Sequence, residues 1–366
     1  MQKLKAALIG CGRIGTKKHI EAYANNKEDV ELVYCCDLNI EKAENAAEKY
    51  SERSGVKTHA VKGYDSILDK DIDFVSIATE SGYHYQITVD FLNAGKHVLV
   101  EKPMALDTDH LEHMVTLSRE KGLKLGICLQ NRFNKPIQAL KQKIDEGAFG
   151  RVFNATARIL WNRNEAYYRQ DNWRGTWELD GGTLMNQCAH NIDLLQWVLG
   201  GDLESVYGVI RNFNHPYIET EDFGVGILKF KNGTVGLLEG TANTYPKNLE
   251  ETISVFGEKG TVVIGGLAVN KILTWRFEGE DTHPLMLEKD PDTVYGNGHT
   301  TLFKDFTDAI LEDRDPYVTG EQGRIEDEIV LAIYKSTVEK REVKFPVSNV
   351  RSTDFNYFVL RDMLKD

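Results

Sequence analysis

The chain has 366 residues, of which 41% are hydrophobic and 27% are charged, and its formal net charge is −12. This length suits about two domains, because a single hydrophobic core stops growing near ~250–300 residues. The acidic excess argues against a nucleic-acid partner, and no apolar run approaches the roughly 20 residues that span a membrane. Five cysteines without metal-like spacing, and an N-terminal stretch that leads directly into an apolar run, predict a cytoplasmic protein without a bound metal.

The first third of the chain alternates short apolar runs with helical patterns. The apolar runs are KAALIG, VELVYCCD, DFVSIAT and HVLVEKP, with helices expected near residues 14–26, 40–53 and 83–95. A further helix over 107–121 and the strand LKLGICLQ complete about six strands by residue 130. Continuously apolar strands belong to parallel sheets with helices on both faces, so this region predicts a doubly wound α/β domain.

The pattern changes after residue 150, where apolar runs are joined by turn signals such as KNGT and GEKGT. The runs are RVFNATARILW, ESVYGVIRNF, DFGVGILKF, TVGLLEGTA, ETISVFGEKGTVVIGG and KILTWRFEG. They predict a second, α+β domain with a large, mostly antiparallel open sheet. We place the first domain at residues 1–128 and the second at residues 129–366.

A glycine-rich loop, GCGRIG, follows the first expected strand and precedes a helix, with Asp37 at the end of the second strand. Glycine permits the tight turn and the close backbone approach, while the helix start stabilises a pyrophosphate. A carboxylate at the second strand accepts hydrogen bonds from ribose hydroxyls and repels a 2′-phosphate. The pattern predicts a Rossmann domain that binds NAD, although the cation of Arg13 leaves NADP open. The expected contacts of the loop are Gly10, Gly12, Arg13, Ile14 and Gly15.

Further cofactor contacts are expected where later strands end, because open α/β sheets bind ligands at the carboxyl ends of their strands. His84 could equally cap the helix that it begins. Asn131 could contact cofactor or substrate. The residues at these strand ends are Thr79, Glu80, His84, Glu101, Lys102, Gln130 and Asn131.

Lys102 and His190 are the two candidates for a catalytic base that takes a hydroxyl proton as hydride leaves an alcohol carbon. Lys102 stands at a strand end, where partial burial and the positive nicotinamide ring would lower its pKa; the alternative is a surface lysine paired with Glu101. His190 shares a helical stripe with Asn186, Asp193 and Trp197 in GGTLMNQCAHNIDLLQW. Asp193 could orient the imidazole, and a structural role for His190 remains the alternative.

Through GCGRIG, EKPMAL and the histidine-bearing helix after GG, the chain resembles the glucose-fructose oxidoreductase and inositol dehydrogenase family. The resemblance implies a Rossmann domain, a C-terminal domain whose open sheet makes subunit contacts, and nicotinamide-dependent chemistry on sugar-like alcohols. It also implies catalytic roles for Lys102 and His190, and a homodimer or homotetramer.

A narrower similarity links the chain to UDP-N-acetyl-2-amino-2-deoxyglucuronate dehydrogenases, which use NAD to oxidise the sugar 3-hydroxyl to a ketone. The similar strings are QNRFN, WRGTWELDGG, MNQCAHNIDLLQW, TYPKNLE, GEKGTVVIGG and YGNGH. The alternatives are a dehydrogenase of a free polyol such as an inositol, and a cofactor-binding regulatory protein without catalysis. Whether NADH leaves or is reoxidised in place by a 2-oxo acid stays open.

Asn186 departs from the family, in which many members carry an aspartate one turn before the histidine. Asparagine cannot take a proton, so proton transfer falls to Lys102 or His190, and an amide suits an anionic substrate. An asparagine that satisfies free backbone groups near the helix start is the alternative.

A basic and aromatic stretch over residues 158–177 contains Arg158, Arg163 and Arg174. Arginine binds carboxylate or phosphate bidentately and aromatic rings stack on bases or sugars, although such a stretch also suits a sheet surface or subunit interface. We favour Arg163 and Arg174 as substrate contacts. The expected substrate contacts are Lys102, Asn131, Arg163, Arg174, Asn186, His190, and, from motif matches alone, Tyr245 and His299.

Overall fold

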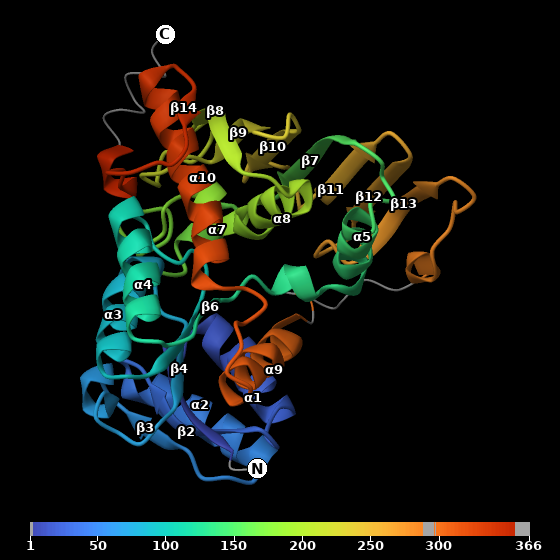
Figure 1. Cartoon of the computed structure of the whole chain (residues 1–366). Helices are drawn as coiled ribbons and strands as arrows, with labels where there is room; N and C mark the ends of the chain where they lie inside the picture. Colours follow the sequence, from blue (N-terminus) through green and yellow to red (C-terminus); the bar gives the residue numbers. More distant parts are fainter. Residues whose placement is uncertain (1–2, 288–295, 297, 356–366) are drawn as a thin grey trace. The chain divides into compact units, whose positions relative to one another are not determined.

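Figure 1 shows the computed structural model of the chain, which describes residues 3–287, 296 and 298–355. Two compact units are present. Unit 1 comprises Met1–Ala105, His110–Gln130 and Asn297–Arg324, and unit 2 comprises Leu106–Asp109, Asn131–Gly296 and Ile325–Asp366. The predicted division between residues 128 and 129 is simpler than this arrangement, because the chain returns to unit 1 after residue 297.

Unit 1 is built on a parallel sheet of six strands in the order β3-β2-β1-β4-β5-β6. The predicted doubly wound domain is confirmed. The register pairs Ile9 with Cys36 and with Ile77, and Ile77 with Val100, so the carboxyl ends of four strands lie at one edge. The strands are β1 (Leu4–Ile9), β2 (Val30–Cys36), β3 (His59–Val61), β4 (Phe74–Ile77), β5 (His97–Val100) and β6 (Leu125–Ile127).

The helices of unit 1 follow the predicted alternation with the strands. The Asn39 side chain accepts the backbone N–H of Glu41 and so caps the start of α2, and Gly55, with a φ of 76°, caps its end. The returning helix α9 packs on α1 within this unit. The elements are η1 (Gly15–His19), α1 (Ile20–Asn25), α2 (Ile40–Ser54), η2 (Tyr64–Ile67), η3 (Ser81–Tyr83), α3 (His84–Asn93), α4 (Thr108–Glu120) and α9 (Gly298–Leu311).

Unit 2 is built on a sheet of eight strands in the order β13-β12-β11-β7-β10-β9-β8-β14. Every neighbouring pair is antiparallel except β7 with β10, so the predicted mostly antiparallel sheet is confirmed. The strands are β7 (Val152–Leu160), β8 (Leu203–Arg211), β9 (Phe223–Phe230), β10 (Val235–Thr241), β11 (Glu250–Gly257), β12 (Gly260–Gly265), β13 (Lys271–Phe277) and β14 (Val343–Lys344).

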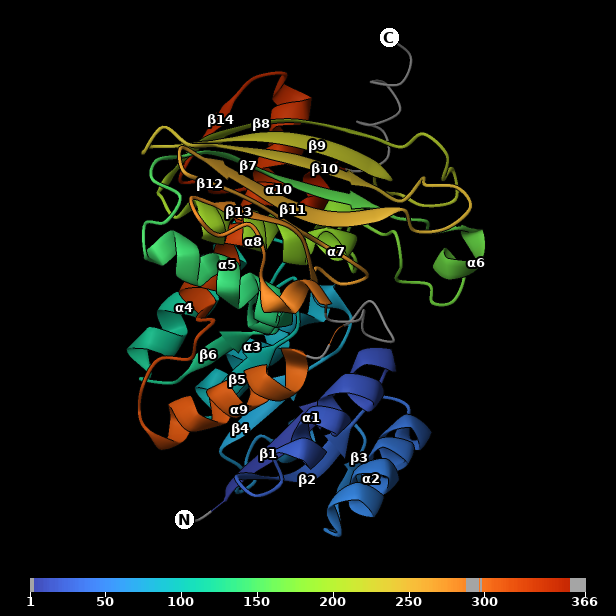
Figure 2. The ribbon, with the colours of Figure 1, turned by 90° about the vertical axis from the view of Figure 1, so that its right-hand side faces the viewer.

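Helices α7 and α8 lie along one face of this sheet (Figure 2). Glycines in the strands allow the close approach, because a Cβ at Gly224 would lie 2.5 Å from Leu184 Cδ1, and one at Gly240 would lie 2.5 Å from Cys188 Sγ. The remaining elements are η4 (Gln130–Phe133), α5 (Lys135–Asp145), α6 (Glu165–Tyr168), α7 (Thr183–Gln187), α8 (Ala189–Leu199), η5 (Pro284–Leu287), α10 (Gly320–Glu339) and η6 (Ser352–Phe355).

Among the described residues, no helix combines the length and the apolar character that crossing a membrane requires.

Candidate active site

The glycine loop after β1 is folded too tightly for side chains at two of its positions. Gly10 has a φ of +93°, and a Cβ there would lie 2.5 Å from the Ala78 carbonyl oxygen. A Cβ at Gly15 would collide with the Gly10 carbonyl oxygen, whereas one at Gly12 would meet no atom within 4 Å. The loop is therefore closed toward the sheet and open at Gly12, which is the shape needed for a pyrophosphate to approach the backbone.

Asp37 connects the end of β2 to this loop. Its Oδ2 accepts the backbone N–H of Cys11 at 2.9 Å, and its Oδ1 accepts that of Asn39 at 2.8 Å. The half-buried carboxylate thus stands beside the glycine loop, where ribose hydroxyls would donate to it. The loop and Asp37 together fit NAD, and they would hold its pyrophosphate and ribose.

The segment that carries Lys102 is anchored by the residues on both sides of it. His84 Nδ1 lies 2.7 Å from the Pro103 carbonyl oxygen, and its Nε2 lies 3.2 Å from that of Thr79. Lys102 N–H lies 3.3 Å from Glu101 Oε2, and the Lys102 side chain is half-buried. Lys102 is therefore held by a constrained backbone at the carboxyl end of β5, as a positioned base requires.

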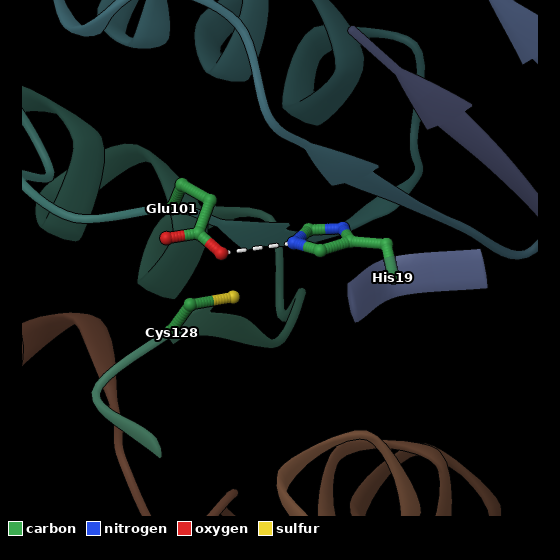
Figure 3. Close-up of side chains that lie close together, drawn as sticks. All are labelled: His19, Glu101 and Cys128. Atoms are coloured by element: carbon green, nitrogen blue, oxygen red, sulfur yellow. Dashed lines mark hydrogen bonds and ion pairs between the residues drawn. The ribbon is translucent and has the colours of Figure 1, made fainter. Parts of the chain in front are cut away.

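Glu101 is the centre of a buried cluster within unit 1 (Figure 3). His19 Nε2 lies 2.9 Å from Glu101 Oε1 and His299 Nε2 lies 3.6 Å from it. Burial alone would raise the pKa of Glu101, but the hydrogen bond from His19 and the nearby imidazole of His299 outweigh it and hold the pKa well below its usual range. Burial, reinforced by the adjacent Glu101, raises the pKa of the Cys128 thiol well above its usual range. The cluster is therefore one buried carboxylate with an imidazole hydrogen-bonded to it and a second imidazole and a thiol close by.

Three of the expected ligand contacts are buried side chains with neighbours in unit 1. Glu101, His84 and His299 are 6%, 1% and 3% exposed, and each lies against other residues of unit 1. The predicted contacts of Glu101 and His84 with the cofactor, and of His299 with the substrate, stay predictions. The contacts of these three side chains also support the segment of Lys102, which the sequence strings alone do not indicate.

In unit 2, the predicted polar stripe is visible in the burial of α7 and α8. Between residues 181 and 190, Asn186 and His190 are partly exposed and the other residues are buried. Asn186 donates its Nδ2–H to Asp180 Oδ1, while Asp180 Oδ2 accepts the Gly175 N–H at 2.6 Å. Because a carboxylate only accepts, this contact orients the amide so that its oxygen points away from Asp180.

Asp193 does not take the role expected of it, because it does not orient His190. Arg132 Nε donates to Asp193 Oδ2 at 2.8 Å, and both side chains are about 1% exposed. The Arg132 guanidinium also lies 4.9 Å from the centre of the Trp197 ring. The partly exposed polar stripe predicted from the helix periodicity therefore ends at His190, because Asp193 belongs to a buried ion pair. The sequence gives no sign of this partner, which comes from the distant QNRFN string.

Arg163 and Arg174 both lie close to one aromatic ring in unit 2. Their guanidinium carbons lie 5.0 and 4.6 Å from the Tyr167 ring centre, and Arg174 Nη1 donates to the Tyr167 hydroxyl at 2.8 Å. Arg163 also lies 4.5 Å from the Trp161 ring, and Arg174 lies 4.5 Å from that of Trp173. We call these five residues the arginine–aromatic cluster.

Arg158, by contrast, is engaged on the sheet. It donates to Glu239 at 2.9 Å and to Glu250 at 3.0 Å. The preference for Arg163 and Arg174 over Arg158 agrees with this pairing.

The remaining expected contacts differ in their surroundings. Gln130 and Asn131 are each 2% exposed, whereas Tyr245 is 91% exposed on the segment after β10. In the YGNGH string, residues 295 and 297 lie outside the described residues. The roles of Gln130, Asn131 and Tyr245 stay predictions.

Sequence reasoning did not identify Glu221, which lies under the Gly181–Gly182 turn that leads into α7. Its Oε1 accepts the Leu184 N–H at 2.7 Å and the Tyr334 hydroxyl at 2.9 Å, and a Cβ at Gly182 would collide with Oε2. Burial raises the pKa of Glu221 to about 8, despite these hydrogen bonds that lower it. Glu221 lies next to the start of β9, and no sequence pattern there indicates that its carboxyl group is buried.

We expect Glu221→Gln to stabilise the protein at alkaline pH. Since the folded pKa of about 8 is above the ordinary 4.5, the contribution of Glu221 to stability is fully present below pH 4.5 and is lost as the pH rises through about 8. Glutamine mimics the protonated acid, so at alkaline pH the variant should be more stable than wild type by ~2–4 kcal/mol. Thermal and denaturant unfolding across the pH range measure this, with exposed Glu178→Gln as the control. Parallel pH profiles of wild type and Glu221→Gln would contradict it.

Comparison with known proteins matches both parts of the chain to one family. Residues 4–128 match the model of the oxidoreductase family with an NAD-binding Rossmann fold, and residues 137–263 match the GFO/IDH/MocA C-terminal domain. Among curated relatives, myo-inositol 2-dehydrogenase of Thermotoga maritima is 23% identical over 93% of this chain and 98% of its own length. D-glucoside 3-dehydrogenase of Escherichia coli is 26% identical over 91% of this chain and 95% of its own length.

Solved structures give a higher identity. The WlbA dehydrogenase from Bordetella pertussis, in complex with NADH and UDP-GlcNAcA, is 36% identical, covers 95% of this chain and 100% of its own, and has a TM-score of 0.82. The WlbA dehydrogenase from Chromobacterium violaceum, with the same two ligands, is 35% identical, covers 95% of this chain and 98% of its own, and also has a TM-score of 0.82.

The family models and the identities to solved structures indicate one family, and the glycine loop has the shape that NAD binding requires. The chain belongs to the GFO/IDH/MocA family of oxidoreductases and is an NAD-dependent dehydrogenase.

Proposed function

We propose that the protein oxidises the 3-hydroxyl of UDP-N-acetyl-2-amino-2-deoxyglucuronate (UDP-GlcNAcA) to a 3-keto sugar. The observation that carries the proposal is the arginine–aromatic cluster, in which two guanidinium groups and three aromatic rings are gathered in one place. Guanidinium groups bind phosphate and carboxylate, and aromatic rings stack on a base or sugar, so the cluster suits an anionic nucleotide sugar. The likeness to two dehydrogenases crystallised with UDP-GlcNAcA supports the same substrate.

Lys102 is the proposed base of the reaction. It stands half-buried at the carboxyl end of β5, where its Nζ takes the proton of the substrate hydroxyl. NAD, when bound, supplies the chemistry of accepting a hydride from the sugar carbon. Glu101 contacts the backbone N–H of Lys102, and His84 contacts the carbonyl of Pro103 on the other side. These two contacts restrict the position of the Lys102 amine during that transfer.

Asn186 and His190 are the proposed sugar contacts in unit 2. The Asn186 amide is oriented by Asp180, so its oxygen serves as an acceptor for a sugar hydroxyl. His190, partly exposed one turn later, donates or accepts a second hydrogen bond. An amide in place of a carboxylate adds no like charge next to a uronic acid, which favours an acidic sugar over a neutral one.

The second candidate is a dehydrogenase of a free polyol, which the inositol dehydrogenase relative favours. A neutral polyol has neither a diphosphate nor a carboxylate, so it offers the two arginines of the cluster no anionic partner beyond the Asp171 carboxylate that already pairs with Arg174. The arginine–aromatic cluster therefore favours a nucleotide sugar over a free polyol as the substrate.

Turnover decides between these candidates. Purified protein is incubated with NAD and UDP-GlcNAcA, UDP-N-acetylglucosamine or myo-inositol, and both reduced nicotinamide and keto sugar are measured. We expect oxidation of UDP-GlcNAcA in preference to the other two, with 2-oxoglutarate added in parallel to reoxidise any NADH that stays bound. Oxidation of myo-inositol alone would replace the proposal by the second candidate, and no product from any substrate would favour a regulatory protein.

The same preparation tests the proposed homodimer or homotetramer. Apolar side chains are at least 40% exposed on strands of the unit 2 sheet, which suits a face buried between copies. They are Phe153, Tyr207, Ile227, Leu237 and Leu273. Light scattering of the preparation gives the number of subunits, and a monomer at every concentration would contradict the assembly.

A further inference from the structure

The buried histidine His19 joins the cofactor loop to the segment of Lys102. It is the last residue of η1, the helical turn that begins at Gly15 of the glycine loop, and its side chain is 0% exposed. Its Nε2 reaches Glu101 across 82 residues of sequence, at 2.9 Å. Glu101 directly precedes Lys102 and lies close to the Lys102 backbone N–H. One hydrogen bond therefore lies between the element that would hold the cofactor and the segment of the proposed base.

The ring of His19 packs against two aromatic rings within unit 1. The Phe303 ring stands edge-on to it at 5.0 Å between centroids, and the His299 ring lies 6.2 Å away. This packing keeps the imidazole in the buried core beside α9, and the hydrogen bond to Glu101 sets where its Nε2 points. The geometry is that of a preset donor aimed at a buried carboxylate, rather than of an imidazole open to a ligand.

We propose that His19 is a positioning residue, which holds the Glu101 carboxylate in place and thereby sets the position of the Lys102 amine relative to the cofactor loop. The inference rests on Lys102 being the base in the proposed function. It predicts that loss of the His19 hydrogen bond lowers the chemical step more than it weakens NAD binding, because the glycine loop and Asp37 remain intact.

A metal ion is the alternative for the same residues, since atoms of His19, Glu101 and Cys128 lie within 4.8 Å of one another. The contacts favour hydrogen bonding. The 2.9 Å between His19 Nε2 and Glu101 Oε1 is a normal hydrogen-bond length. The Nε2 atoms of His19 and His299 both lie nearest to the Glu101 carboxylate, and not around a central position that a metal ion would take. A zinc ligand would also need Cys128 as a thiolate, whereas burial and Glu101 favour the thiol.

The test exchanges His19 for residues that differ in where they place a donor. Glutamine can put its amide nitrogen near the place of Nε2, asparagine reaches only the place of Nδ1, and phenylalanine keeps the ring without a donor. We expect His19→Gln to keep kcat within about 3-fold of wild type, and His19→Asn and His19→Phe to lower kcat by ~10–100-fold with KM for NAD changed by less than about 3-fold.

Phe303→Leu is the matched control, because it removes the ring that packs on His19 and leaves the hydrogen bond. We expect it to lower the melting temperature and to leave kcat within about 3-fold of wild type. A purely structural role of His19 predicts the opposite pattern, in which His19→Phe keeps kcat and Phe303→Leu loses it. That pattern, or equal losses in His19→Gln and His19→Asn, would overturn the proposal.

A second readout does not depend on the substrate. Lys102 is labelled with an amine-reactive acetylating reagent, and its rate is compared by peptide mass spectrometry with that of exposed Lys121 in the same sample. We expect the ratio of the two rates to change several-fold in His19→Asn and to stay near wild type in His19→Gln. An unchanged ratio of the Lys102 and Lys121 rates in all variants would refute the positioning role of His19. Because this labelling needs no substrate, the result does not depend on which sugar the wild-type protein oxidises, and the positioning role and the proposed substrate are tested separately. Stoichiometric metal in the purified protein that disappears in His19→Asn would replace the proposal by the metal site.

Discussion

Replacing Lys102 with methionine should lower kcat for sugar oxidation by ~10²–10⁴-fold, because general-base catalysis contributes a factor of that size. Methionine has a similar length and no ionisable group, so it keeps the volume of the half-buried side chain and removes the proton acceptor. The dissociation constant for NADH should stay within about 3-fold of wild type, since the glycine loop and Asp37 are untouched.

Two further variants make this result specific. Lys102→Arg keeps the positive charge, but a guanidinium is too weak an acid to lose its proton near neutral pH, so this variant should be nearly as inactive as Lys102→Met. Lys121→Met, on an exposed part of unit 1, should behave as wild type. Full activity of Lys102→Met with UDP-GlcNAcA, measured as keto sugar formed per enzyme, would remove Lys102 as the base and leave His190 as the candidate.

The fold could be predicted because its information is local. Unbroken apolar runs such as VELVYCCD mark strands buried on both faces, and glycine spacing after the first of them marks the loop that a nucleotide requires. The same local patterns separate the parallel from the antiparallel sheet. The return of residues 298–324 to unit 1 could not be predicted in this way, because a helix pattern does not say which surface it packs on.

The exposure of the helical stripe could be predicted from its spacing, whereas the ion-pair partner of Asp193 could not. Asn186 and His190 are partly exposed as the helical stripe predicts. Asp193, one turn further, is instead neutralised by Arg132, which is 61 residues away in the sequence. A charged side chain inside a protein needs a partner, and the partner's identity follows from tertiary structure rather than from spacing.

The Glu101 cluster shows the same limit more sharply. The string EKP does not distinguish its residues by exposure. In the structure Glu101 is buried, whereas Lys102 is partly exposed. The counterparts of Glu101 come from η1 and α9, which lie 82 and 198 residues from it in the sequence. The arginine–aromatic cluster was easier to anticipate, because four of its five members lie within residues 161–173 and the last is Arg174.

Replacing Arg174 with leucine should raise KM for UDP-GlcNAcA by ~10–100-fold while kcat and the KM for NAD change by less than about 3-fold. The expected loss is that of one or two hydrogen bonds to a charged group, about 1.5–3 kcal/mol, and it appears in KM because contacts remote from the reacting carbon bind ground state and transition state alike. Arg163→Leu should have a similar effect with some loss of stability, since Arg163 also donates to Gln187 at 2.8 Å in α7.

Arg158→Leu is the matched control for both variants. Arg158 belongs to the same stretch of sequence, but its guanidinium is paired with Glu239 and Glu250 on the sheet, so an anionic ligand would have to compete with two carboxylates. Its KM for UDP-GlcNAcA should therefore stay near wild type. The inhibition constant of UDP, measured against UDP-GlcNAcA, separates the nucleotide from the sugar carboxylate: a matching rise in Arg174→Leu assigns this arginine to the diphosphate, and an unchanged constant assigns it to the uronic acid. Equal KM values for wild type, Arg174→Leu and Arg163→Leu would remove the arginine–aromatic cluster from the substrate site, and with it the observation that favours a nucleotide sugar over a free polyol.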